Sequence, residues 1–125
     1  MSNPTFRSGP ITFEAGQKLE PSTLVKIDGG KAVPASATGA VFGAVTEKAD
    51  PVNTAKPNAI AIHYGPAAVK LTATGKAEDI KAGDAVYAAV GGKVAKTGTV
   101  KVGVAAADGA GGKVLTILNL LPVSA

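Results

Sequence analysis

Residues 24–33 read Leu-Val-Lys-Ile-Asp-Gly-Gly-Lys-Ala-Val, and this stretch indicates the fold more clearly than any other. Two short runs rich in Val and Ile lie on either side of Asp28-Gly29-Gly30. Such runs are typical of β-strands when turn residues bound them. Glycine supplies the positive φ angles that a tight hairpin turn requires. The stretch therefore predicts a β-hairpin.

Similar runs recur on both sides of this hairpin along the chain. The 16 Gly and 8 Pro leave few stretches long enough for a helix of three turns, which excludes an all-α bundle. The one plausible helical turn is Ala77 to Lys81. We expect an all-β fold: a small single-domain β-barrel or β-sandwich of short strands with an extended N-terminal arm. The predicted strands are residues 11–14, 23–28, 31–34, 40–48, 59–64, 67–74, 84–89, 93–96, 100–106 and 113–120.

A second copy of the hairpin pattern lies further along the chain. Residues 24–33 fall on residues 86–95, where Val90-Gly91-Gly92 also resembles a tight hairpin turn. Residues 41–45 match residues 101–105 in the same way. The pattern suggests two related half-units, residues 19–48 and 80–106. The alternative is that any two hairpins with a Gly-Gly turn look alike.

Two segments depart from the strand pattern. Met1 to Pro10 carries two prolines and little periodicity, so we expect residues 1–10 to form an extended arm and residues 11–125 a single β-domain. Ala49 to Asn58 is a polar stretch with two prolines, typical of a loop. Small β-domains usually place their contacts on arms and loops.

The composition of the 125 residues restricts function. There is no Cys and one His, which excludes disulfides, thiolate nucleophiles and Cys-based metal sites. With 3 Phe, 2 Tyr and no Trp, the core must be built mainly from small side chains. The net charge of +4 permits an acidic partner without requiring one. We expect no secretory signal, and the longest apolar stretch is far below the roughly 20 residues that span a bilayer.

The sequence contains no motif that indicates catalysis, metal binding or phosphate binding. Strand alternation places His63 on the face opposite Ile60 and Ile62, so we interpret it as a surface or interface residue. Glu78, Asp79 and Asp84 lie among lysines and glycines, and their spacing supports no metal site. Gly-Lys occurs four times but is never followed by Ser or Thr, as a phosphate-binding loop requires. We expect no enzymatic activity, no cofactor and no metal.

We do not expect the chain to bind nucleic acid, because it has one Arg and its lysines are dispersed along the sequence. The segment Lys81 to Val86 is similar to part of biotinyl and lipoyl carrier domains. No lysine has the neighbours of their modified lysine, which argues against a carrier role.

Several motifs of the second half carry a resemblance to a family. Gly83-Asp84-Ala85-Val86-Tyr87, Gly92-Lys93-Val94, Val102-Gly103-Val104-Ala105 and the run Val114 to Leu118 are similar to the C-terminal half of capsid cement (head decoration) proteins of tailed bacteriophages. Upstream, residues 24–27, 42–45 and 65–71 resemble the first half and the middle of the same family. The resemblance covers roughly Leu19 to Leu120. It rests on turn and core residues, and residues 50–57 and the arm do not match.

The resemblance implies a structural virion protein without enzymatic activity. It implies binding to the major capsid protein on the outside of an assembled head, commonly as trimers, after synthesis in the host cytoplasm. Nucleic acid and membrane are not expected partners. The alternative, from another class, is a secreted or surface β-sandwich that binds a glycan or a receptor; the five aromatic residues argue against it.

The candidate capsid contacts lie at the N-terminus. Phe6, Arg7, Ile11 and Phe13 include two of the three phenylalanines and the only arginine. An arm that orders on the capsid could add a strand to a capsid sheet, with aromatic anchors in pockets and Arg7 on a carboxylate. The alternative is that Ile11 and Phe13 pack on this domain as an edge strand.

Overall fold

The computed structural model describes residues 11–49, 59–64, 67–119 and 121–123. Within them the chain is all-β, as the sequence predicts, with two five-stranded sheets and two short 3₁₀ turns. Each predicted strand is present, and several are shorter than expected. The elements are β1 (Ile11–Glu14), β2 (Thr23–Asp28), β3 (Lys31–Pro34), β4 (Gly43–Val45), β5 (Ala59–His63), β6 (Ala68–Thr72), η1 (Ala77–Asp79), β7 (Ala85–Ala88), η2 (Val90–Gly92), β8 (Val94–Ala95), β9 (Lys101–Ala105) and β10 (Lys113–Ile117).

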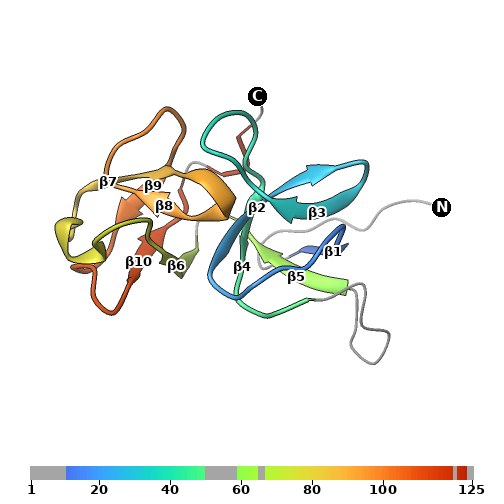
Figure 1. The fold of residues 1–125 in the computed structure, drawn as a ribbon, viewed down its shortest axis with the longest axis horizontal. Coiled ribbons are helices and arrows are strands. Elements are labelled where there is room, and N and C mark those ends of the chain that lie inside the picture. Colours follow the sequence, from blue (N-terminus) through green and yellow to red (C-terminus); the bar gives the residue numbers. More distant parts are fainter. Residues whose placement is uncertain (1–10, 50–58, 65–66, 120, 124–125) are drawn as a thin grey trace.

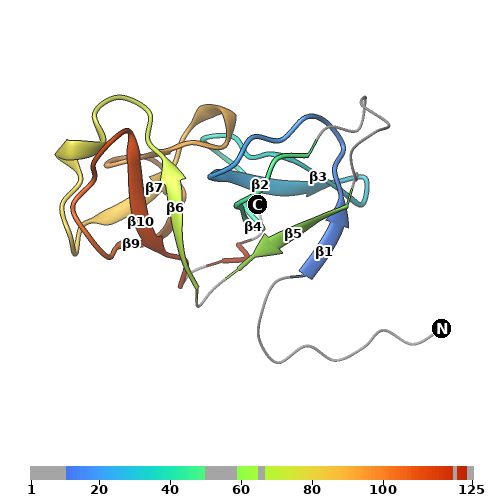
Figure 2. The ribbon, with the colours of Figure 1, turned by 90° about the horizontal axis from the view of Figure 1, so that it is seen from below.

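The two sheets follow each other along the chain and lie side by side (Figures 1 and 2). The N-terminal sheet has the order β1-β5-β4-β2-β3, and the C-terminal sheet has the order β6-β10-β9-β7-β8. All strand pairs within them are antiparallel. We call residues 11–64 the N-lobe and residues 67–118 the C-lobe. The arrangement is sandwich-like and is not a single closed barrel.

The strand orders of the two lobes are the same when each number of the N-lobe is raised by five. The detail agrees: a one-residue parallel bridge joins Ala15 to Ala32 in the N-lobe, and another joins Ala73 to Val94 in the C-lobe. The structure therefore shows that the two lobes share one topology. That residues 19–48 and 80–106 arose by duplication stays a prediction.

A pair of glycines occupies matching places in the central strands. A Cβ on Gly43 would collide with the carbonyl of His63, and a Cβ on Gly103 would collide with the carbonyl of Ile117. His63 ends β5 and Ile117 ends β10, so the same close approach of two strands is built twice.

The hairpin predicted for residues 24–33 is present, and it is formed by β2 and β3. Asp28 pairs with Lys31, and the two residues between them, Gly29 and Gly30, have φ angles of 60° and 81°. Positive φ at both central residues is the signature of a type I′ turn, whose twist matches that of the strands.

The second predicted hairpin is also present, because β7 and β8 pair antiparallel on either side of Val90-Gly91-Gly92. Gly91 and Gly92 have φ angles of 73° and 77°, and a bond from the amide of Ala89 to the carbonyl of Lys93, 2.8 Å away, closes the turn. Gly92 also packs on the N-lobe, where its amide donates to the carbonyl of Ala35 at 2.7 Å. This contact between the lobes could not be predicted from the local sequence.

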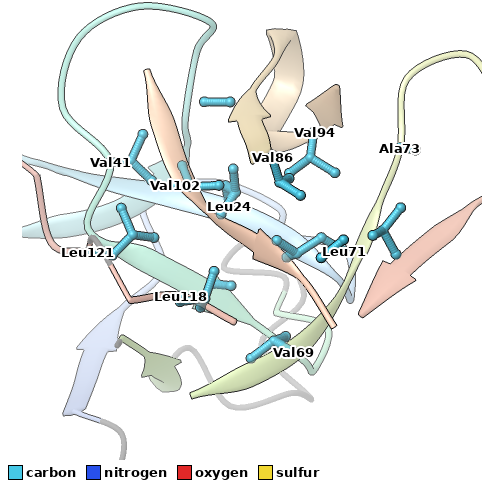
Figure 3. Close-up of a cluster of buried hydrophobic side chains, with 14 of the residues drawn as sticks. Leu24, Val41, Val69, Leu71, Ala73, Val86, Val94, Val102, Leu118 and Leu121 are labelled. Carbon is cyan, nitrogen blue, oxygen red and sulfur yellow. The ribbon is translucent and has the colours of Figure 1, made fainter. Parts of the chain in front are cut away.

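Each lobe has a core of its own. The N-lobe cluster holds Ala15, Leu19, Val25, Ala32, Val45, Ala49, Ile60 and Ile62. The C-lobe cluster is larger and also includes four N-lobe residues: Leu24, Ala35, Val41 and Ala44. Figure 3 shows Leu24 among the side chains of the C-lobe, which include Val86, Val102 and Leu71. The N-terminal sheet is therefore buried on both faces at β2 and β4, with Val25 and Val45 on one side and Leu24 and Ala44 on the other.

The chain closes by returning to the N-lobe after β10. Val123 and Val41 exchange two backbone hydrogen bonds, of 3.0 and 2.8 Å. Leu121 is buried in the C-lobe cluster. Residues 121–123, which we call the return segment, connect the end of the C-lobe to the middle of the N-lobe.

Candidate interaction surfaces

Three of the five aromatic side chains form a row on the N-lobe. The rings of Phe13 and Phe42 meet edge to face, with centroids 5.2 Å apart, and those of Phe42 and Tyr64 do the same at 6.1 Å. Edge-to-face contacts of this kind stabilise a pair beyond the area that it buries. All three residues remain half-buried, so the row closes one end of the N-lobe core and also meets solvent.

An apolar groove runs beside this row. It encloses about 360 Å³, and its walls carry no charged side chain. One wall comes from the N-lobe, including Ile27 and Phe42, and the other from the return segment, through Pro122 and Val123. An apolar surface rimmed by polar residues commonly marks a contact with another macromolecule.

The structure places two of the four predicted contact residues. Ile11 and Phe13 lie in β1, which pairs with β5 at the edge of the N-terminal sheet. This is the edge-strand alternative of the sequence analysis, and the ring of Phe13 belongs to the aromatic row. Phe6 and Arg7 lie outside the described residues.

The chemistry-bearing residues stay apart from one another. His63 is half-buried at the end of β5, opposite Ala44. Glu78 and Asp79 are exposed in η1. Among the described residues, no three His, Cys, Asp or Glu side chains come together as metal ligands would.

Two carboxylates are occupied with the backbone of turns. The Asp84 carboxylate accepts a hydrogen bond from the amide of Lys81 at 2.9 Å, and Asp108 accepts one from the amide of Ala82 at 2.9 Å. Asp84 also lies 4.0 Å from the ammonium of Lys96 at a partly exposed site, where such a pair contributes little. The bond of Asp84 is local, as is usual for Asp in turns, whereas the bond of Asp108 joins two turns that are 26 residues apart along the chain.

The glycine-rich stretch 108–112 is a turn between β9 and β10. Gly111 and Gly112 have φ angles of 61° and 78°, and Ala110 pairs with Lys113 across them. The amide of Gly109 donates to the carbonyl of Ile80 at 2.8 Å. A shallow depression of about 370 Å³ beside this turn is lined by Lys70, Asp108 and Lys113, among others.

The sequence does not predict the aromatic row or the groove. It predicts a strand at Phe42 and no functional role for Tyr64 or the return segment. The sequence offers one signal for this surface, the scarcity of aromatic residues. A core built from small side chains does not need three of the five aromatic side chains on one surface.

No family model, curated protein or solved structure matches the chain. Within the described ranges, the chain contains no helix with the length and apolar character that a membrane crossing demands.

Proposed function

We propose that the chain is a structural virion protein, a capsid cement that binds the outer surface of an assembled phage head and stabilises it. The proposal rests first on the resemblance over residues 19–120. Its motifs fall on elements that shape the C-lobe: Gly83-Asp84 forms the turn before β7, Gly92 is the contact between lobes, and Gly103 is the close approach of β9 and β10.

The observation that supports this function best is the kind of surface that the N-lobe presents. It is apolar and aromatic, and it adjoins the edge strand β1. A surface of this kind favours contact with other protein chains, which a trimeric cement needs between its own copies as well as on the capsid. Phe13 anchors β1 on the domain, which leaves Ile11 and the preceding residues 1–10 as the part that contacts the capsid.

A cement acts by bridging capsid subunits that would otherwise separate. A standard contact buries about 800 Å² on each partner. Three copies in one trimer engage several subunits at once, which converts modest contacts into high avidity. The partner is the major capsid protein, and the site of action is the exterior of the virion.

The test is to mix the purified chain with expanded, undecorated heads and to measure the bound copies by co-sedimentation. We expect saturable binding and a higher temperature of DNA release. A variant that lacks residues 1–9 should bind more weakly at an unchanged melting temperature, whereas Lys76→Ala, an exposed substitution in the C-lobe, should bind as the parent chain does. Failure of the parent chain to bind any head rejects the proposal, and binding to an immobilised glycan instead favours the alternative class.

A further inference from the structure

The matching topology of the lobes allows the exposure of corresponding residues to be compared. The bridges at Ala15 and Ala73 align β1 with β6, so Phe13 corresponds to Leu71. The same bridges align β3 with β8, because they end at Ala32 and Val94. Ala32 pairs with Ile27 and Val94 pairs with Ala88, so Ile27 corresponds to Ala88.

Two further pairs follow from the glycines and the strand ends. Phe42 precedes Gly43 as Val102 precedes Gly103, and Tyr64 follows β5 as Leu118 follows β10. The four C-lobe residues, Leu71, Ala88, Val102 and Leu118, are at most 2% exposed. Their N-lobe counterparts are Phe13, Ile27, Phe42 and Tyr64, and all four are half-buried. The same end of the core is therefore covered in one lobe and open in the other.

The cover of the C-lobe is the outer face of the N-terminal sheet. Leu24 and Ala44 are partners across β2 and β4, both are 0% exposed, and both belong to the C-lobe cluster. Backbone bonds hold this cover in place: the amide of Thr72 donates to the carbonyl of Ser22 at 3.0 Å, and that of Gly92 to the carbonyl of Ala35.

The C-terminal sheet has a corresponding outer face. In the N-lobe, the row across β5, β4 and β2 is His63, Ala44 and Leu24. In the C-lobe, the row across β10, β9 and β7 is Ile117, Val104 and Ala85. Register partners on neighbouring strands point to the same face of a sheet. This row is apolar, yet Ile117 is 38% exposed and the other two residues are only half-buried.

We propose that these two surfaces are partners between copies of this chain. The C-lobe row Ile117-Val104-Ala85 of one copy covers the open end of the N-lobe core, at Ile27, Phe42 and Tyr64, of the next copy. The contact repeats between chains the one that Leu24 and Ala44 make within a chain. It joins two different surfaces, so it propagates from copy to copy until the rotation closes a ring. Three copies make a ring of six similar lobes.

This inference refines the trimer of the proposed function and is independent of attachment to a head. The test uses Ile117→Lys on the row, Tyr64→Lys on the open end, and Val90→Lys as the control, since Val90 is 71% exposed and lies on neither surface. Light scattering on the parent chain and on Val90→Lys should give three times the chain mass of 12.2 kDa. Either of the other variants alone should give 12.2 kDa with an unchanged circular dichroism spectrum.

The decisive measurement is an equimolar mixture of Ile117→Lys and Tyr64→Lys. Only the pairing of an intact row on one variant with an intact open end on the other survives, so the mixture should give a heterodimer of twice 12.2 kDa. If Tyr64→Lys fails to fold, Ile27→Lys replaces it. A mixture that stays monomeric, a parent chain that is monomeric at millimolar concentration, or a dissociated Val90→Lys overturns the inference. A parent trimer that binds no head leaves the inference standing and rejects the proposed function; a monomer that binds heads does the reverse.

Discussion

The contact of Gly92 with the N-lobe gives the sharpest prediction about stability, because its neighbour provides a matched control. Gly91 and Gly92 have nearly the same backbone conformation, with φ angles of 73° and 77°. A Cβ on Gly91 would meet nothing within 4 Å, whereas one on Gly92 would lie 2.5 Å from the carbonyl oxygen of Leu24 and would also collide with the Thr23 side chain. Alanine at either position bears the same cost of positive φ, and only Gly92→Ala adds the clash.

The magnitudes follow from these two effects. Positive φ costs an alanine about 1 to 2 kcal/mol relative to glycine. Overpacking against backbone costs about 1 to 3 kcal/mol more. We therefore expect Gly91→Ala to lower the free energy of unfolding by about 1 kcal/mol and Gly92→Ala by about 3 kcal/mol, a large share of the roughly 5 to 15 kcal/mol of a typical domain.

Urea unfolding followed by circular dichroism measures both free energies, and thermal melts provide a second reading. Each kcal/mol should lower the melting temperature by about 3 to 6 °C in a domain of this size. Gly92→Ala should therefore melt about 10 °C or more below the parent and clearly below Gly91→Ala. Equal losses in the two variants would refute the idea that this loop is fitted tightly against β2.

Three further substitutions test other parts of the fold. Gly103→Ala should lower the free energy of unfolding in urea by about 2 kcal/mol or more, because its Cβ would collide with the carbonyl of Ile117; a neutral result would mean that β9 and β10 separate at little cost. Leu71→Ala should cost about 2 to 5 kcal/mol in the same assay, since Leu71 is 0% exposed in the larger core, and a loss below 1 kcal/mol would contradict that packing. Asp108→Ala should cost only about 0.5 to 1.5 kcal/mol, since its bond to the amide of Ala82 is exposed, and a melting temperature that falls as far as for Leu71→Ala would contradict so small a contribution.

The sequence predicted the local elements well because glycine and proline mark their ends. Runs rich in Val and Ile between such residues identify every strand, and Asp28-Gly29-Gly30 identifies its turn type, because both depend on neighbours along the chain. Strand lengths are less accurate. β10 ends at Ile117, before the predicted end at residue 120, although the amide of Leu118 still donates to the carbonyl of Ala67 in the register of the β6-β10 pair.

Features that depend on distant segments were not predictable from local patterns. The pattern of Val90-Gly91-Gly92 predicts a turn, which is present, but it does not show that Gly92 packs on β2. The apolar groove joins Phe42 to Val123, and the C-lobe core takes up Leu24 from the other lobe. Of the predicted capsid contacts, Ile11 and Phe13 lie in β1, as the edge-strand alternative predicted, and the aromatic partner of Phe13 was not predicted.

The order of the strands along the chain has a consequence for synthesis on the ribosome. All strands of the N-lobe are complete before the first strand of the C-lobe emerges, and no strand is exchanged between the sheets. The N-lobe can therefore pair its strands early, but Leu24 and Ala44 stay in water until the C-lobe arrives to bury them. Val123 bonds to Val41 only after the segment that follows β10 has left the exit tunnel. A nascent chain held before the C-lobe has emerged keeps an apolar face open to chaperones or to another nascent copy.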